Sequence, residues 1–435
     1  MNIKVIRLME NLRLRFSFLR IQTHHSIILS NFTPMNQREL FLQHVAQTSL
    51  TPLALEIVKA EGCYMWDKNG KEYLDLISGI SVCNVGHRNP QVISAIKDQL
   101  DKYMHIMVYG ELVESPQVLY AEKIASILPD SLNCIYFTNS GAEATEGAMK
   151  LAKRLTGRPN MVAFNESYHG STQGALSVMG SEYWRNAYRP LLPGIRHIDH
   201  NVLAQLDMID CNTACVIAEP IQAERGVLSP SLAWMKALRK KCDETGALLI
   251  LDEIQTGFGR TGTMFAFEQF DIVPDILLLG KAIGGGMPLG AFVAERERMM
   301  AFADNPILGN ITTFGGHPVS CAAGLAALDY LMDAKLMSTV DRNRKLFKKL
   351  LKHPMILSFR SAGMLMAIEF DSYETNKQVI DCCIKKGLFT DWFLFASNCM
   401  RIAPPLIITI EQIYDACNII IEACDSILDE EEDDC

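Results

Sequence analysis

The sequence predicts an α/β protein, with a mostly parallel central sheet in a large domain and a smaller α+β domain built from both ends of the chain. Between about residues 133 and 294, short apolar segments alternate with helical stretches, beginning at 134–137 and 143–156 and ending at 276–279. Strands separated by helices form parallel sheets covered on both faces. After residue 316 the pattern changes: strand-like segments at 365–370 and 400–402 lie between helical stretches at 318–337 and 411–428.

A hairpin indicates where the small domain begins. Two alternating segments between residues 62 and 76 flank Asn69-Gly70, and Asn-Gly between strand-like runs is the strongest short-range hairpin signal. Because 435 residues exceed what one core usually supports, we expect more than one domain. The expected parts are a basic N-terminal extension (1–34), the N-terminal part of the small domain (35–80), the large domain (81–316), the C-terminal part of the small domain (317–428) and an acidic tail (429–435).

The N-terminal extension differs in composition from the rest of the chain. It is rich in lysine and arginine, and Glu10 is its only acid. This composition resembles a mitochondrial transit peptide. The alternative is that the protein starts at Met35, where Met-Asn-Gln-Arg-Glu opens a plausible helix. We favour the alternative and expect a cytoplasmic protein, with the mitochondrial matrix as the second choice.

Composition and charge argue against several classes of function. The net charge is −9 and no clustered basic face is visible, which disfavours a nucleic-acid partner. The longest apolar runs fall far short of the roughly 20 residues that cross a bilayer, so we expect no membrane span. The 13 cysteines are scattered and lack zinc-site spacing, so we expect reduced thiols and no metal site.

The first motif that carries chemistry is Thr138-Asn139-Ser140-Gly141-Ala142-Glu143, between a predicted strand and a predicted helix. Its structural interpretation is a capping box, with Ser140 as N-cap and Glu143 three residues later. Its functional interpretation is an anion site. Gly141 lets the backbone approach a ligand, and the helix N-terminus offers free N–H groups to a phosphate. Both interpretations can hold at once.

Two further motifs end apolar strands at the same edge of the predicted sheet. Asp252 follows the apolar segment 247–251. A buried carboxylate at this strand end would be costly unless it meets a cation. The structural interpretation is an ordinary acid at the end of a strand. Lys281 follows 276–279, so we expect its amine to be neutralised, paired or covalently modified unless it snorkels to the surface. An anion cradle, a buried acid and a buried lysine suit a cofactor with a phosphate, a basic ring nitrogen and an aldehyde.

These motifs resemble the signature of class III aminotransferases, which have pyridoxal-phosphate fold type I. The resemblance covers essentially residues 35–428 and rests on Leu-Asp-Glu-Ile-Gln-Thr-Gly-Phe-Gly-Arg-Thr-Gly from Leu251 and Gly-Lys-Ala-Ile-Gly-Gly-Gly from Gly280. It also includes Ser140-Gly141-Ala142, Tyr168-His169-Gly170, Glu219-Pro220-Ile221-Gln222 and Thr313-Phe314-Gly315-Gly316. It implies pyridoxal 5′-phosphate as cofactor and a homodimer with active sites at the subunit interface.

The resemblance implies a role for each matching residue of the cofactor site. Lys281 would bind the cofactor covalently and later move a proton between substrate and cofactor. Asp252 would keep the pyridine nitrogen protonated, and Gln255 would hydrogen-bond to the phenolic oxygen. Ile254 and Tyr168 would sandwich the ring, and His169 would belong to the same site. Ser140, Gly141 and Ala142 would hold the phosphate. Thr313 would reach the phosphate bound in the partner subunit.

The resemblance also implies substrate-binding residues. Arg401 matches the arginine that clamps a substrate carboxylate. Glu224 matches the glutamate that pairs with this arginine when an ω-amino substrate must be admitted. Glu219 and Ile80 complete the predicted substrate site.

The chain departs from the family pattern near this site. The usual Gly or Ser, followed by Glu-Gly or Glu-Ala, is here Ala223-Glu224-Arg225. Ser171 stands where many members carry an arginine for an anionic substrate end. Ile80 stands where ornithine aminotransferases carry a tyrosine that meets the α-carboxylate. These departures leave the amino donor open and count against ornithine.

We therefore expect a transaminase that moves the terminal amino group of an ω-amino acid, of the 4-aminobutyrate or N-acetylornithine type, to 2-oxoglutarate by a ping-pong mechanism. One alternative is an aminomutase or racemase of the same fold, which needs no external oxo acid. Another is a non-catalytic homologue that acts as a binding subunit. The intact Lys281 argues against this last alternative.

Overall fold

The structure, a computed structural model, describes residues 36–108 and 110–433, so the basic extension lies outside the described residues. The described residues divide into two compact units, with the boundary between Glu56 and Ile57. In the first unit, helix α2 (Gln37–His44) begins after Asn36, whose side chain accepts a hydrogen bond from the N–H of Glu39. The Glu39 carboxylate accepts one from the N–H of Asn36, which closes a capping box. The helix predicted after Met35 is therefore present.

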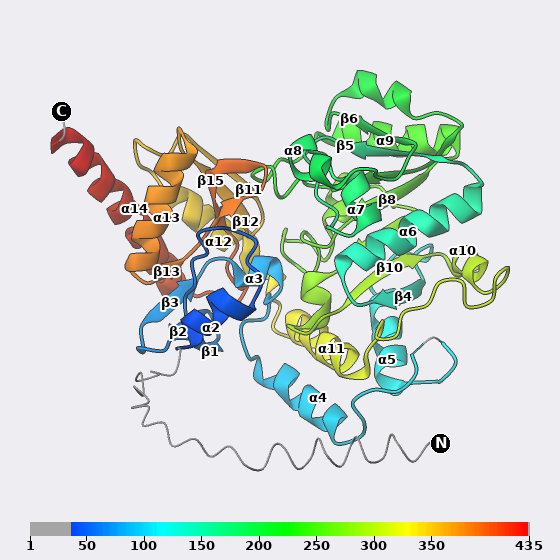
Figure 1. The fold of residues 1–435 in the computed structure, drawn as a ribbon, viewed down its shortest axis with the longest axis horizontal. Coiled ribbons are helices and arrows are strands. Elements are labelled where there is room, and N and C mark those ends of the chain that lie inside the picture. Colours follow the sequence, from blue (N-terminus) through cyan, green and yellow to red (C-terminus); the bar gives the residue numbers. More distant parts are fainter. Residues whose placement is uncertain (1–35, 109, 434–435) are drawn as a thin grey trace, which may run out of the picture. The chain divides into compact units, whose positions relative to one another are not determined.

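A seven-stranded sheet forms the centre of the second unit, in the order β4-β10-β9-β8-β7-β5-β6 (Figure 1). Strands β5 to β9 run parallel, and β10 is antiparallel to both β4 and β9, so β4 points the same way as β9. This confirms the mostly parallel sheet, although the sequence pattern did not predict β6 or β10. The strands are β4 (Cys134–Thr138), β5 (Asn160–Phe164), β6 (Ile195–Ile198), β7 (Thr213–Ala218), β8 (Leu248–Asp252), β9 (Ile276–Leu279) and β10 (Gly290–Ala294).

Helix α6 (Gly141–Thr156) packs across one face of this sheet (Figure 1). Its Ala144 and Ala148 are fully buried in a cluster with strand side chains that include Phe292. Gly147 permits this approach, because a Cβ there would lie 2.3 Å from Cε1 of Phe292. Since α6 follows β4 after a two-residue turn, its N-terminus lies at the carboxyl edge of the parallel strands.

The second unit contains further helices, and α5 (Ser115–Ala125) and α9 (Leu232–Thr245) also pack on strands of the sheet. Helix α9 contributes the buried Trp234, which packs edge-on against Phe164 of β5 at 5.4 Å between ring centroids. The others are α3 (Ser78–Ser81), α4 (Pro90–Leu100), α7 (Gln173–Val178), α8 (Glu182–Arg185), α10 (Arg296–Met299) and α11 (Pro318–Asp333). Residues 318–337, predicted as one helix, break after Asp333, where Lys335 has a left-handed φ of 50°, and α12 (Met337–Leu350) follows.

Two smaller four-stranded sheets lie apart from the central sheet. One has the order β1-β2-β3-β13 and joins β1 (Ile57–Glu61), β2 (Tyr64–Asp67) and β3 (Glu72–Asp75) to β13 (Leu388–Phe389), so segments far apart in sequence share it. The predicted turn is present, and Gly70 has a φ of 82°. The other has the order β11-β12-β15-β14, with β11 (Ser358–Ala362), β12 (Leu365–Glu369), β14 (Trp392–Phe393) and β15 (Ala396–Ile402).

Helix α13 (Tyr373–Lys385) packs against β13 and β15, and α14 (Ile410–Asp433) packs against α12 and α13 (Figure 1). The predicted stripe of α14 is buried: Ile413, Ala416, Ile420, Ala423 and Ile427. This separate group of sheets and helices confirms a smaller α+β part next to the α/β part.

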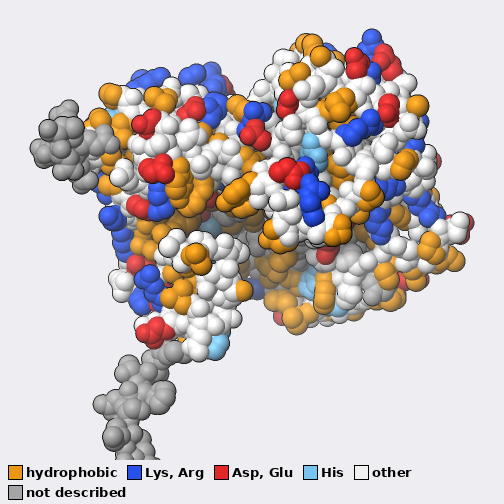
Figure 2. All heavy atoms as spheres, turned by 45° about the horizontal axis from the view of Figure 1, so that its top comes forward, with side chains coloured by type: hydrophobic (Ala, Val, Ile, Leu, Met, Phe, Trp, Pro, Cys, Tyr) orange, Lys and Arg blue, Asp and Glu red, His pale blue; other side chains and the backbone are white. Residues whose placement is uncertain are grey.

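Three further features of the described residues concern membrane spans, metal sites and surface charge. Over residues 36–108 and 110–433, no helix is both long and apolar enough to cross a membrane. Within the same residues, no group of three or more His, Cys, Asp or Glu side chains is arranged to hold a metal ion. On the face drawn in Figure 2, Lys and Arg side chains are interspersed with Asp and Glu.

Candidate active site

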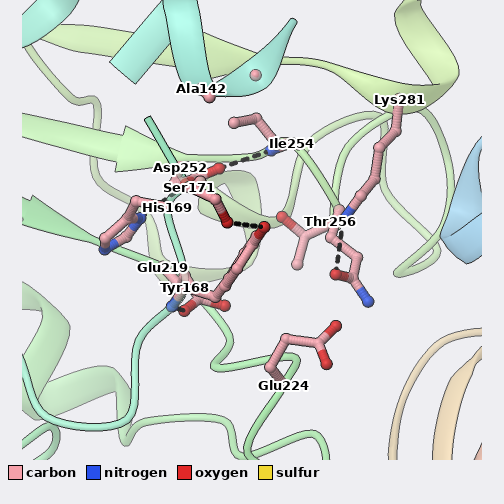
Figure 3. A pocket seen from close by; sticks show the side chains of 13 residues that line it. Ala142, Tyr168, His169, Ser171, Glu219, Glu224, Asp252, Ile254, Thr256 and Lys281 are labelled. Atoms are coloured by element: carbon pink, nitrogen blue, oxygen red, sulfur yellow. Dashed lines mark hydrogen bonds and ion pairs between the residues drawn. The ribbon is translucent and has the colours of Figure 1, made fainter. Parts of the chain in front are cut away.

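A pocket opens at the carboxyl edge of the central sheet (Figure 3). Its walls come from segments that follow β4, β5, β7, β8 and β9, the place where open α/β sheets bind ligands. Figure 3 shows the side chains of Asp252 and Lys281 on different sides of it. The lining residues are Gly141, Ala142, Tyr168, His169, Gly170, Ser171, Glu219, Glu224, Asp252, Ile254, Gln255, Thr256 and Lys281.

The N-terminus of α6 forms one end of the pocket. Ser140 is the N-cap, and its Oγ accepts a hydrogen bond from the N–H of Glu143 at 3.2 Å. Glu143 accepts from the N–H of Asn139 at 2.9 Å, so the carboxylate reaches one residue beyond the partner that a capping box requires. A Cβ on Gly141 would lie 2.7 Å from Cδ1 of Ile254, so glycine lets Ile254 cover this helix end. The free N–H groups of the first turn can therefore bind an anion inside the pocket.

Asp252 lies at the end of β8 with 5% of its surface exposed. Its Oδ2 lies 2.7 Å from Nδ1 of His169, and its Oδ1 accepts a hydrogen bond from the N–H of Ile254 at 3.0 Å. Each carboxylate oxygen thus has its own hydrogen-bond partner. The other ring nitrogen of His169, Nε2, is buried and has no partner within the described part of the chain. A cation in the pocket would meet an acid that is already oriented.

Lys281 follows β9, and its Nζ donates a hydrogen bond to Oε1 of Gln255 at 2.7 Å. Its backbone φ is 50°, in the left-handed region that lysine rarely adopts, so the surrounding structure holds it in place. Burial lowers the pKa of Lys281 to about 8, although Glu224 acts in the opposite direction. The Nε2 group of Gln255 is buried without a partner among the described residues. The pocket thus contains an amine, Nζ of Lys281, with a lowered pKa, and beside it a hydrogen-bond donor without a partner, Nε2 of Gln255.

Glu219 ties two walls of the pocket together. One carboxylate oxygen accepts from the N–H of Tyr168 at 2.9 Å, and the other accepts from the N–H of Ala223 at 3.0 Å. Burial raises the pKa of Glu219 to about 7. The Tyr168 hydroxyl lies 3.2 Å from Oγ of Ser171. Glu219 therefore fixes the loop that carries Tyr168.

Glu224 closes another side of the pocket and pairs with Arg401 of β15. Its two carboxylate oxygens accept hydrogen bonds from Nη1 and Nη2 of Arg401, each at 2.9 Å, a bidentate arrangement. Burial opposes ionisation of Glu224, but the guanidinium outweighs burial and lowers the pKa to about 2. Arg401 also donates from Nε to Oδ1 of Asp391 at 2.8 Å. Arg401 itself lies behind Glu224 and does not line the pocket.

The structure brings most of the predicted residues together. Lys281, Asp252, Gln255 and the other lining residues share one pocket, and Arg401 joins them through Glu224. Besides Arg401, three predicted residues do not line it. Ser140 uses its hydroxyl as an N-cap just outside, Thr313 is exposed in the segment before α11, and Ile80 is 36% exposed in α3 with a φ of 60°.

Sequence reasoning missed several participants. Thr256 lines the pocket, and its Oγ1 donates to the carboxylate of Glu253; its place directly after Gln255 was the available signal. His169 was assigned to the cofactor site without its contact to Asp252. Asp391 was not considered, and no local pattern marks it, because its contact to Arg401 depends on pairing between two short strands.

Comparison with known proteins identifies the family. Residues 45–424 match the class-III aminotransferase family. The chain belongs to this family and is an enzyme. Its cofactor is pyridoxal 5′-phosphate, on which class III aminotransferases depend. The predicted family, fold type and cofactor are thus confirmed.

Solved structures of aminotransferases resemble most of the chain. An ornithine aminotransferase from Toxoplasma gondii ME49 is 30% identical, with a TM-score of 0.83 and coverage of 92% of this chain and 97% of that one. A second structure of ornithine aminotransferase from this organism, with the same identity and coverage and a TM-score of 0.84, has partial occupancy of pyridoxal phosphate at its active site. A Bacillus anthracis aminotransferase is 28% identical, with a TM-score of 0.84 and coverage of 90% and 98%.

The residues of this aminotransferase fit the cofactor. The anion-binding end of α6 suits a phosphate, the buried Asp252 suits a protonated ring nitrogen, and Lys281 supplies an amine. The unpartnered Nε2 of Gln255 would be a donor for the phenolic oxygen of the cofactor. Buried polar groups seldom remain without partners, so these unused atoms indicate a polar ligand.

Proposed function

We propose that this aminotransferase moves the terminal amino group of an ω-amino acid, of the 4-aminobutyrate or N-acetylornithine type, to 2-oxoglutarate by a ping-pong mechanism. One observation carries the proposal: Glu224 lines the pocket while its carboxylate covers Nη1 and Nη2 of the buried Arg401. With Glu224 in place the guanidinium is neutralised, and an uncharged carbon of an ω-amino donor can lie against this wall. With Glu224 displaced, the two Nη groups can take the α-carboxylate of 2-oxoglutarate or glutamate.

The contacts of the cofactor site support a role for each of its residues. Bound pyridoxal phosphate supplies an aldehyde that takes up the amino group and a protonated ring that accepts electrons. We assign to Nζ of Lys281 the transfer of the proton at the substrate carbon, because its lowered pKa leaves much of the amine neutral near pH 8. Asp252, oriented by His169, holds the proton on the ring nitrogen.

The remaining residues position the cofactor. The N–H groups of Gly141 and Ala142 bind its phosphate, with Ser140 shaping the helix end through its capping bond. Ile254 and Tyr168 hold the ring between them, and Gln255 donates to the phenolic oxygen. Glu219 keeps Tyr168 in place through its N–H.

We also propose a homodimer in which Thr313 acts in the partner's site. Thr313 is exposed and lies outside the pocket of its own chain. Its neighbours Ile311 and Phe314 are large apolar side chains that are 49% and 52% exposed. Exposed apolar side chains around a polar residue suit a surface that another subunit covers.

A donor panel tests the proposed reaction. The purified enzyme is loaded with pyridoxal phosphate and assayed with ω-amino acids, α-amino acids and simple amines, against 2-oxoglutarate and against pyruvate. We expect the highest kcat/KM for an ω-amino donor with 2-oxoglutarate. Turnover of a single amino acid without any oxo acid would identify an aminomutase or racemase instead. An absorbance band near 400 nm that borohydride abolishes would show that the lysine carries the cofactor.

A further inference from the structure

Three consecutive residues enclose the guanidinium of Arg401 on the sides away from Glu224. Asp391 accepts from Nε at 2.8 Å, the carbonyl of Trp392 accepts from Nη2 at 3.2 Å, and the ring of Phe393 lies 4.5 Å from Cζ. The backbone reinforces this arrangement, since the N–H of Arg401 donates to the carbonyl of Asp391 at 2.8 Å. These contacts come from β14, the residue before it and β15, which belong to one antiparallel sheet.

Glu224 approaches the fourth side from a different part of the chain, the segment after β7. Its carboxylate takes Nη1 and Nη2 of Arg401, and it also accepts from the N–H of Leu394 at 3.0 Å. Three donors built by residues 391–401 therefore converge on one carboxylate. An α-carboxylate that replaced Glu224 would find the same three donors, so Glu224 occupies a preformed carboxylate site.

Exchange of the Glu224 carboxylate for a substrate carboxylate would leave the guanidinium of Arg401 without this counter-charge for a time. Arg401 is 2% exposed, and a buried guanidinium without a counter-charge is costly. Asp391 is bound to the Nε edge, which the exchange does not touch, so it stays in place whichever carboxylate occupies the other side. Burial raises the pKa of Asp391 above its ordinary value, although the guanidinium of Arg401 acts in the opposite direction.

We propose that Asp391 is the positioning residue of Arg401: it holds the guanidinium in orientation, and keeps it charge-compensated, while Glu224 gives way to the α-carboxylate of a substrate. This inference rests on the proposed function, in which Arg401 receives that carboxylate. Asp391 does not touch the substrate. Its effect falls on the half-reaction with α-amino acids, because only that half-reaction uses the uncovered Nη groups.

Three variants test the proposal. Asp391→Ala removes both the charge and the acceptor for Nε. Asp391→Asn removes the charge but keeps an oxygen in the position of Oδ1. Glu369→Ala is the matched control: Glu369 pairs with Arg360 at 2.6 Å in the same sheet, and its side chain is 30% exposed against 31% for Asp391.

The measurement is single-turnover absorbance of the cofactor-loaded enzyme, with glutamate and with the best ω-amino donor separately. We expect Asp391→Ala to raise the half-saturating glutamate concentration by about tenfold or more while changing the limiting rate less, and to leave the ω-amino half-reaction within about threefold. Asp391→Asn should recover part of the glutamate affinity. Glu369→Ala should leave both half-reactions unchanged.

Several outcomes would overturn the proposal. Equal losses for both donors would make Asp391 a structural residue, as would unchanged glutamate binding in Asp391→Ala. An Asn variant as poor as the Ala variant would exclude positioning through Nε. If the wild type converts glutamate but no ω-amino donor, the proposed function fails while the glutamate comparison among the variants still decides the role of Asp391. If the wild type converts no α-amino acid, both ideas fall.

Discussion

Nδ1 of His169 lies 2.7 Å from Oδ2 of Asp252, and both side chains are almost completely buried in the pocket wall. Nδ1 must carry a hydrogen to bond to an ionised carboxylate, so Nε2 of a neutral ring has none. The contact fixes the acid in orientation, while Ile254 fixes its second oxygen through a backbone N–H. An acid held in this way can face a protonated ring nitrogen without moving.

This relationship predicts the behaviour of Asp252→Asn. The variant should still bind pyridoxal phosphate, because the α6 end and Lys281 are unchanged. Its kcat should fall by about 10²–10³, since a neutral amide cannot hold the positive charge on the ring. Steady-state kinetics and absorbance of the loaded variant are the measurements. A kcat near that of the wild type, with full cofactor loading, would show that Asp252 has another task.

Lys281→Ala should lose at least about a thousandfold in activity while the protein keeps its fold, because the proposed function makes the amine both the covalent anchor and the proton carrier. Lys281→Arg is a useful control, since it keeps a positive charge but lacks a nucleophilic amine. We expect both variants to be inactive and to show native circular dichroism. Activity within about tenfold of the wild type in either variant would contradict the assignment.

The pKa of Lys281, about 8 in the folded protein, predicts a pH profile. Below pH 8 the amine is protonated in both the folded and the unfolded chain. Between pH 8 and the ordinary lysine pKa of 10.5, the amine has lost its proton in the folded chain and keeps it in the unfolded chain. Stability of the cofactor-free protein should therefore gain from this group as pH rises through that window. The rate of pyridoxal phosphate binding to Nζ should rise with a midpoint near pH 8. A midpoint above pH 10 would show that burial does not shift this lysine.

Local sequence patterns predicted the positions of Asp252 and Lys281 because each follows an apolar strand, and a strand end at the carboxyl edge of a parallel sheet is where ligands bind. The α6 N-terminus was predictable for the same reason. Contacts between distant segments were not predictable from local patterns. His169 meets Asp252 across 83 residues, and only tertiary packing decides such pairs. The Glu224–Arg401 pair, 177 residues apart, came from the family resemblance and not from the residues themselves.

Arg260 belongs to the family motif that starts at Leu251, but its place in the motif does not show what the side chain does. It belongs to the same motif as Asp252 and Gln255, yet it lies fully buried away from the pocket lining. Its Nη1 donates to the carbonyls of Met364 and Pro404, and its Nη2 donates to side-chain oxygens of Ser78 and Asn84. The arginine therefore ties together segments that lie far apart in the sequence.

Arg260→Leu should lower the free energy of unfolding by about 3 kcal/mol or more, because several buried acceptors lose their donor. Arg298→Leu is the control. Arg298 pairs with Asp275 at 2.6 Å but is 32% exposed, so we expect a loss of about 1 kcal/mol or less. Urea unfolding of both cofactor-free variants is the measurement. Similar losses in the two variants would show that Arg260 is not a structural tie.

The last prediction concerns Glu224 and Arg401, which in the proposed function serve two different substrates at one place. Glu224→Ala removes the carboxylate that neutralises the guanidinium during the ω-amino half-reaction, so that half-reaction should slow far more than the half-reaction with glutamate. Arg401→Ala should chiefly harm glutamate and 2-oxoglutarate, by about 2–5 kcal/mol if a charge-assisted bidentate pair is lost. If the two residues formed only a surface ion pair, their loss would cost about 0–1 kcal/mol. Single-turnover absorbance changes with each donor separate these cases. Equal effects of Glu224→Ala on both donor types would reject the exchange at Arg401 and leave the aminotransferase assignment intact.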